Sequence, residues 1–130
     1  MDTYEMRVVM TETQQGKLTF PDVVRRLLEV GVESYFVDFA TAKETFYMTD
    51  GQTHVEAMIL QPDSVADAFS SEGMGAAIRG AQTDTIRYPE FVKRSTAAGV
   101  IGYWAFLTGK KVVYFGRNGE MHVEEFPRSV

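Results

Sequence analysis

The two histidines of the chain stand in identical local sequences, and histidine is the side chain best suited to acid–base and metal chemistry near neutral pH. Both occur in the tripeptide His-Val-Glu, at His54–Glu56 and at His122–Glu124. If these segments are β-strands, each glutamate lies two residues from its histidine on the same face of the sheet. The spacing therefore allows metal ligation, proton transfer, or packing with a hydrogen bond between the two side chains.

Each of these roles makes a different use of the paired motifs. A two-fold arrangement of the two motifs could gather two imidazoles and two carboxylates around one metal ion, although we expect no bound metal and no cofactor. The metal candidates are His54, Glu56, His122 and Glu124. In an acid–base role, aromatic and basic side chains predicted on the same face, including Lys43, would assist. The catalytic candidates are therefore His54, Glu56, His122, Glu124, Tyr47 and Lys111. We favour the packing role.

The chain repeats itself at a constant offset of 68 residues. Twelve of the 43 pairs from Gln14 to Glu56 are identical to the residue 68 positions later, and the comparison needs no gap. Internal similarity at a fixed offset is typical of repeated structural units. We therefore predict an internal duplication, with two repeats at about 14–61 and 82–130 that share one fold and are related by a pseudo-two-fold axis.

Each repeat contains signals for one helix followed by three strands. Pro21 and Pro89 suit the first turn of a helix, and Gly31 and Gly99 suit its C-terminal end, where a positive φ is needed. Aromatic and β-branched residues predict strands at about 34–40 and 101–107. Two hairpins follow, with strands at 44–49 and 52–59 in the first repeat and at 111–117 and 120–126 in the second.

The hairpin turns predict which side chains face each other. Asp50-Gly51 and Asn118-Gly119 favour two-residue type I′ turns, which would place His54 opposite Tyr47 and His122 opposite Phe115. The alternate positions would form the core face. Those core positions are Phe46, Met48, Val55, Ala57, Tyr114, Gly116 and Val123.

The segment between the repeats predicts further helices. Residues 63–82 read as two short helices broken at 70–73, and the offset of 68 then places an N-terminal helix at about 2–14. The sequence therefore predicts an α+β fold in one domain, residues 1–130. It consists of two α-β-β-β repeats with antiparallel strands, plus N-terminal and middle helices.

Composition and charge narrow the classes of partner. The chain has no cysteine and a net charge of −5, but basic residues gather between Arg79 and Arg117. Such a segment could contact an anion or an acidic partner, or attract the acidic half of the chain itself. We do not expect nucleic acid as a partner, because no nucleic-acid motif accompanies these residues. The candidate ligand-binding residues are Arg117, Asn118 and Tyr103.

The longest unbroken run of apolar residues and glycine, 97–107, is too short to span a bilayer, and the N-terminus lacks a signal-peptide pattern. We therefore expect a cytoplasmic protein without a membrane span.

Several motifs resemble those of one family of small proteins. They are Ala76-Ala77-Ile78-Arg79, Gln82, Ala98–Tyr103, Gly109, Tyr114–Glu120, His122-Val123-Glu124, Phe126-Pro127 and, in the first half, Gly31-Val32, Tyr35, Val37-Asp38, Tyr47 and Asp50-Gly51. In these motifs the chain resembles the YbcV-like family, which consists of bacterial and prophage-encoded proteins of unknown function that often carry the label phage envelope protein. The resemblance covers nearly the whole chain and implies a family rather than an activity.

Together these observations favour a soluble, non-enzymatic binding or interaction protein with an unidentified protein partner. The alternative is a small enzyme or metal-binding protein that uses the two His-x-Glu motifs. A homodimer is also expected, since a sheet face with Tyr47, Phe115 and Phe126 partly exposed would bind a second copy.

Overall fold

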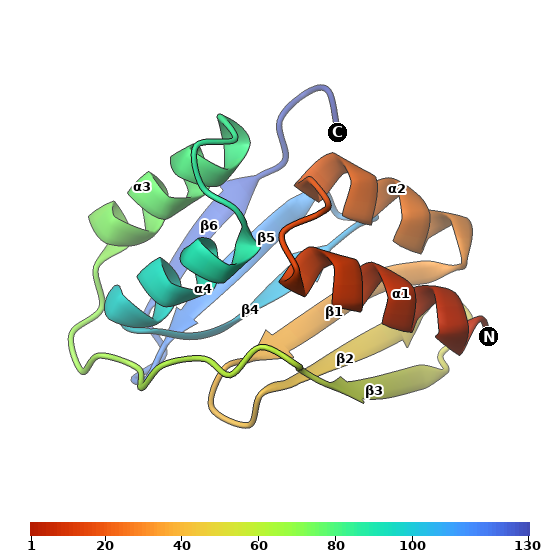
Figure 1. The fold of residues 1–130 in the computed structure, drawn as a ribbon, viewed down its shortest axis with the longest axis horizontal. Helices are drawn as coiled ribbons and strands as arrows, with labels where there is room; N and C mark the ends of the chain where they lie inside the picture. The colour runs from red at the N-terminus through yellow and green to blue at the C-terminus, as the bar shows by residue number, and fades with distance from the viewer.

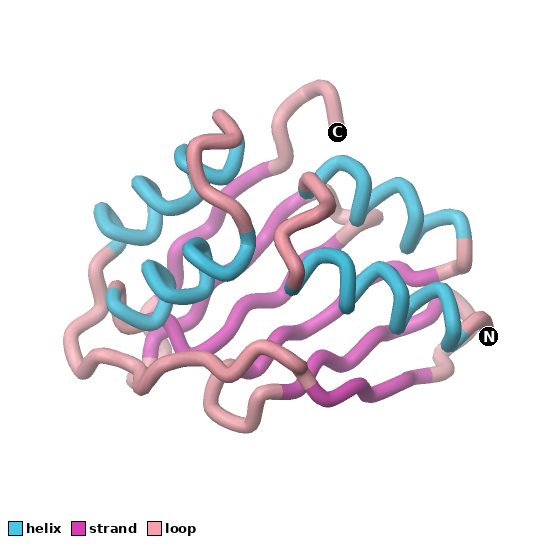
Figure 2. Tube along the Cα trace, in the orientation of Figure 1, coloured by secondary structure: helices cyan, strands magenta, loops and turns pink.

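The chain forms one six-stranded antiparallel sheet with four helices on one of its faces (Figures 1 and 2). The computed structural model describes all residues, 1–130. In chain order the elements are α1 (Thr3–Gln14), α2 (Phe20–Glu29), β1 (Val32–Asp38), β2 (Lys43–Met48), β3 (Thr53–Ala57), α3 (Ser71–Gln82), α4 (Tyr88–Ala97), β4 (Val100–Phe106), β5 (Lys111–Gly116) and β6 (Met121–Glu125). The predicted α+β class is confirmed, and each half contains two helices before its three strands.

The two halves have the same order of elements. Every helix and strand of the second half begins and ends 68 residues after its counterpart in the first half. The strands lie in the order β3-β2-β1-β4-β5-β6, so β1 and β4 meet at the centre. Phe36 and Trp104, which are 68 residues apart, face each other in that central pair. A local pseudo-two-fold axis therefore passes between these two residues.

The helices that precede the strands begin and end where the sequence indicates. In α2, Thr19 and Asp22 form a capping box around Pro21. Gly31 and Gly99 follow α2 and α4 with φ angles of +89° and +80°, values that favour glycine. Side-chain hydrogen bonds also join α1 to α2, because Arg26 donates to carboxylates of α1 at 2.9–3.2 Å.

Both hairpins differ from the prediction by one residue in register. Gly51 donates to the carbonyl of Met48, and Met48 donates to the carbonyl of Gln52, so the loop has three residues instead of two. Gly51, with φ +89°, forms the bulge that such a loop requires. The second hairpin has the same geometry, with Gly119 at φ +84°. The predicted type I′ turns are therefore wrong.

This change of register moves residues of β3 and β6 to the opposite face of the sheet. His54 lies opposite Phe46 instead of Tyr47, and His122 lies opposite Tyr114 instead of Phe115. Three residues expected in the core, Val55, Ala57 and Val123, are exposed, with Val55 and Val123 each 53% exposed. The four others, Phe46, Met48, Tyr114 and Gly116, are buried as predicted.

The segment before α3 is not helical. The two short helices predicted within 63–82 are replaced by a single helix, α3, whose N-terminus is capped by the side chain of Ser70. Residues 58–70 instead run along one end of the sheet from β3 to α3 (Figure 1). Backbone hydrogen bonds attach this connection to the end of α4, from Ala66 to Thr96 and from Ser70 to Ala98.

The core lies between the helices and the sheet, and the other sheet face carries no helix (Figure 2). We call the uncovered face the open face. Its central aromatic residues are Phe36, Tyr47, Trp104, Phe106 and Phe115, and apolar residues near its edges are Val55, Val113, Met121 and Val123. Tyr47 stacks on Trp104 with 5.2 Å between ring centroids. None of the four helices has the length and apolar character that a membrane crossing needs.

Candidate functional site

A cavity of about 510 Å³ lies between the helices and the sheet. Its wall includes nine pairs of residues that are 68 positions apart, among them Tyr35 and Tyr103, so the cavity straddles the pseudo-two-fold axis. Eighteen of its 29 lining residues are hydrophobic. Cavities of this size, with an apolar wall and a few polar groups, are typical of small-molecule sites. We call it the interlayer cavity.

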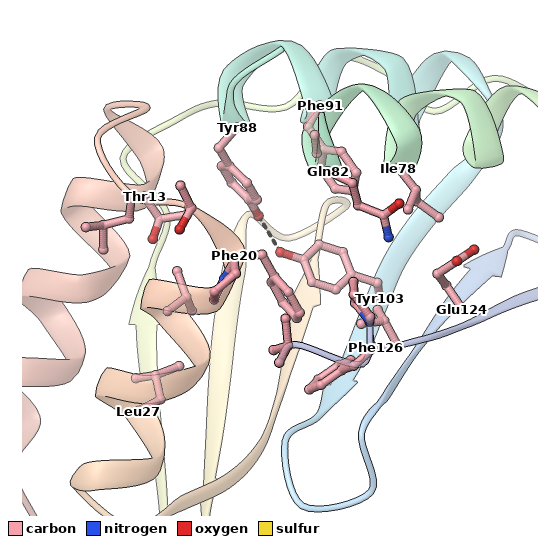
Figure 3. Close-up of a pocket in the computed structure, with 18 of the residues that line it drawn as sticks. Thr13, Phe20, Leu27, Ile78, Gln82, Tyr88, Phe91, Tyr103, Glu124 and Phe126 are labelled. Carbon is pink, nitrogen blue, oxygen red and sulfur yellow. Dashed lines mark hydrogen bonds between the residues drawn. The ribbon is translucent and has the colours of Figure 1, made fainter. Parts of the chain in front are cut away.

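Four tyrosines bring aromatic rings and hydroxyl groups to the cavity wall. They are Tyr35, Tyr88, Tyr103 and Tyr114. Figure 3 shows Tyr88 of α4 and Tyr103 of β4 pointing toward one another, and their hydroxyl oxygens are 2.7 Å apart. Burial raises the pKa of all four tyrosines, so their hydroxyls stay protonated near neutral pH.

One carboxyl group, that of Glu44, is buried on this wall. Glu44 is 7% exposed and points to the helix side of β2, between the buried residues of that strand. Burial, and then the charge of Glu56 on the neighbouring strand, raises the pKa of Glu44 from 4.5 to about 8. No hydrogen bond or cation within the protein lowers it. The interlayer cavity therefore holds a carboxyl group that is mostly protonated at neutral pH.

The two halves contribute different chemistry to the cavity. Glu44 in the first half corresponds to Val112 in the second, so only one of the two positions carries an acid. Conversely, Phe46 corresponds to Tyr114, and Phe20 corresponds to Tyr88. The first half thus supplies the buried carboxyl group, and the second half supplies three of the four tyrosine hydroxyls.

The rim of the cavity is polar and carries an excess of acidic residues. Arg87 is the only basic residue on the wall, and its Nε lies 3.0 Å from an oxygen of Asp84. Glu124 and Glu125 of β6 also lie on the wall. Phe20 and Phe126 pack edge to face beside it, with 5.1 Å between ring centroids (Figure 3). The expected partial exposure of Phe126 therefore falls at this rim and not on the open face.

The paired histidines do not meet. His54 lies on β3 and His122 lies on β6, which are the two opposite edges of the sheet. Adjacent strands are about 4.8 Å apart, so five strand spacings separate these edges. No group of three or more potential metal ligands occurs in the chain. The four-ligand metal cluster considered from the sequence is therefore not formed within one chain.

Each histidine instead contacts its own glutamate. The Nε2 atom of His54 is hydrogen-bonded to Glu56, which also accepts two hydrogen bonds from Arg7 at 3.3 Å. Burial would raise the pKa of Glu56, but the hydrogen bonds from Arg7 and His54 outweigh it and lower the pKa. This arrangement fastens β3 to α1, as expected of a packing role.

His122 takes part in a second, more exposed group of side chains. Its Nδ1 atom is 2.6 Å from the hydroxyl oxygen of Ser71, at the start of α3, and its Nε2 atom is 3.3 Å from a carboxylate oxygen of Glu124. A hydroxyl, an imidazole and a carboxylate in series can move a proton away from the hydroxyl. The surface hollow beside them is lined by five residues, none of them hydrophobic.

The remaining candidates lie in different places. Tyr47, Lys43 and Lys111 belong to the open face and are separated from both histidines by the sheet, so these three side chains cannot assist the histidines as the sequence suggested. Arg117 and Asn118 lie exposed in the β5–β6 turn, where Arg117 pairs with Asp67. Only Tyr103, among the predicted ligand-binding residues, reaches the interlayer cavity.

Sequence reasoning missed Glu44, although the sequence contains a signal for it. Glu44 alternates with Phe46 and Met48, the two residues of this strand assigned to the core face. A glutamate in phase with core residues predicts a buried carboxyl group, and such groups mark functional sites more often than exposed ones. The comparison with Val112 at the offset of 68 strengthens that signal.

Comparison of the chain with protein-family models finds no match, and comparison with curated proteins finds no match either. The resemblance to the YbcV-like family therefore stays a prediction, and the function has to be argued from the site.

Proposed function

We propose that this protein is a non-enzymatic binding protein and that its ligand, a small and largely apolar molecule, occupies the interlayer cavity. The observation that carries this proposal is the unpaired carboxyl group of Glu44 on the wall of a 510 Å³ apolar cavity. Burying an acid without a partner is unfavourable for folding, and its presence is accounted for if a ligand supplies the partner.

The lining also favours binding over catalysis. The wall carries tyrosines, acids and apolar side chains, and neither histidine lies on it. Every tyrosine hydroxyl on the wall is held protonated by burial, so none is prepared as a nucleophile. These groups can orient a molecule through hydrogen bonds and ring contacts, as the polar and aromatic residues of binding sites do.

A pair of variants on one strand tests the proposal. Val112 is buried on the cavity wall, and Val113 is its neighbour on the open face. We expect Val112→Phe to fill part of the cavity and to abolish the rise in unfolding temperature that a bound ligand causes in a thermal-shift screen of small apolar metabolites. Val113→Phe, the same change on the other face, should leave that rise intact. Equal rises in both variants would contradict a ligand in the cavity.

A second candidate function is supported by the series Ser71–His122–Glu124. Its geometry would let His122 accept the Ser71 proton while the hydroxyl oxygen attacks an ester carbonyl, with the alcohol as leaving group. We rank it second because the adjacent hollow has no apolar residue to hold an acyl group. Hydrolysis of p-nitrophenyl acetate that Ser71→Ala abolishes would support this activity, and an unchanged rate in Ser71→Ala would exclude it.

We also propose that the open face joins two copies of the chain. Its aromatic residues lie at the centre of the sheet with no helix over them (Figure 2), and Val55, Met121 and Val123 near its edges are exposed. Apolar faces of this kind are typical of interfaces between protein chains.

A further inference from the structure

We infer that the ligand of the interlayer cavity is an apolar organic cation, a protonated amine whose ammonium group pairs with Glu44 while its hydrocarbon part packs among the tyrosine rings. This inference rests on the proposed function, because it identifies the ligand class of the same cavity. It starts from the carboxyl group of Glu44, a buried ionisable group on the cavity wall to which the protein gives no cation and no hydrogen-bond donor. A carboxylate accepts hydrogen bonds and attracts cations, and it repels anions.

The other charges on the wall favour the same class of ligand. The only base, Arg87, is already paired with Asp84, so it is not free to neutralise an anionic ligand. Glu124 and Glu125 add negative charge near the rim. Acidic groups that line an apolar cavity attract cations and exclude anions, because the low dielectric of the walls concentrates the field.

The aromatic residues complete a site for an organic cation. Tyr103 lies at the centre of the tyrosine group, with ring centroids 6.2 Å from Tyr35 and 5.5 Å from Tyr114. The faces of tyrosine rings attract ammonium groups, and this attraction is strongest where water is excluded. The rings also give the hydrocarbon part of an amine a large apolar surface to contact.

Binding of a cation would release the proton of Glu44 to the solvent. The titratable groups near Glu44 are Tyr35, Tyr88, Tyr103 and Glu56, and Glu56 is itself paired with cationic Arg7. Helices α1 and α2 line the cavity with uncharged side chains only. An ammonium group beside Glu44 therefore favours the ionised carboxylate, and below about pH 8 the proton competes with the ligand.

Three probes with the same naphthalene ring separate the possible ligand classes. They are 2-(1-naphthyl)ethylamine, 2-(1-naphthyl)ethanol and 1-naphthylacetate, which carry a positive, a neutral and a negative group. Each is titrated by calorimetry into the wild-type protein and into Glu44→Gln, in two buffers of different ionisation enthalpy, which reports the number of protons released. Glu33→Gln is the control, since Glu33 is an exposed acid outside the cavity. Glu44→Val, which copies Val112, is a second variant in case Glu44→Gln does not fold.

We expect the amine to bind about 10 to 100 times more tightly to the wild-type protein than to Glu44→Gln, as for a hydrogen bond between charged groups. Its affinity should rise about tenfold per pH unit between about pH 6 and pH 8, with release of about one proton. Glu33→Gln should behave as the wild type. If the three probes bind equally well, if the anion binds best, or if Glu44→Gln keeps the preference for the amine, the cation inference is wrong and the cavity remains a binding site. If no probe binds, the proposed function is wrong as well.

Discussion

Replacing Glu44 with glutamine should remove a large pH dependence of the stability of this protein. The pKa of Glu44 is 4.5 in an unfolded chain and about 8 in the folded protein. Between these values the folded state binds one more proton than the unfolded state, so the free energy of unfolding decreases as the pH rises. At about 1.36 kcal/mol per pKa unit, the loss amounts to at most about 5 kcal/mol between about pH 4.5 and pH 8.

Urea unfolding at several pH values, followed by fluorescence of the single tryptophan, measures this effect. The wild type should lose several kcal/mol of stability between about pH 5 and pH 8, and Glu44→Gln should lose much less over that range. The carboxyl groups with lowered pKa, Asp22, Asp50 and Glu56, stabilise the folded state at higher pH and lose that effect only as the pH falls through their folded pKa values. Glu33→Gln should keep the wild-type slope. An equal slope in Glu44→Gln and the wild type would refute a buried, unpaired carboxyl group at this position.

Three further predictions concern the packing of α1 on α2, a hydrogen bond on the cavity wall, and the open face. Arg26→Ala should lower the free energy of unfolding by about 1–2 kcal/mol, because Arg26 joins α2 to two carboxylates of α1, whereas the exposed Arg25→Ala should change it by less than about 0.5 kcal/mol. Tyr103→Phe should cost about 1 kcal/mol in thermal or urea unfolding, since it removes the hydrogen bond to Tyr88. Light scattering should give twice the mass of one chain, and Val123→Lys on the open face should convert the protein to a monomer. A monomeric wild type would contradict the proposed dimer, and unchanged stability in the first two variants would contradict the contacts described.

Local signals in the sequence were sufficient for the helices and for the number of strands. Proline near the start and glycine after the end fixed the limits of α2 and α4, because these residues restrict the backbone in ways that neighbours rarely override. The offset of 68 then located α1, whose own amphipathic pattern is weak. The helix predicted at the start of 63–82 is absent, since the backbone of this segment is held by hydrogen bonds to the end of α4 that no local pattern reveals.

The length of each hairpin loop decides which face of the sheet the side chains of β3 and β6 occupy. Asp-Gly and Asn-Gly fit both a two-residue turn and a three-residue loop whose glycine forms a bulge. The two options differ by one residue in register, and that residue decides whether His54 and His122 point to the helices or to the open face. Glu44 and Phe46 lie on the same strand, so their shared face does not depend on the turn. The burial of Glu44 could therefore be predicted from the sequence, whereas the surroundings of the two histidines could not.

The cavity itself could not be predicted from the sequence. It forms where the two helix pairs and the central strands leave space, and its wall combines residues from both halves and from the C-terminal segment. The Tyr88–Tyr103 hydrogen bond and the ring contacts around it depend on how α4 packs on β4, which is a property of the folded chain.

The most direct test of a ligand site between helices and sheet is to locate a bound probe by nuclear Overhauser effects. With 2-(1-naphthyl)ethylamine bound, the naphthyl protons should show contacts to the side chains of Met10, Phe91 and Tyr103, which line the interlayer cavity. Contacts confined to Trp104 and Phe115 would place the probe on the open face and would contradict the account.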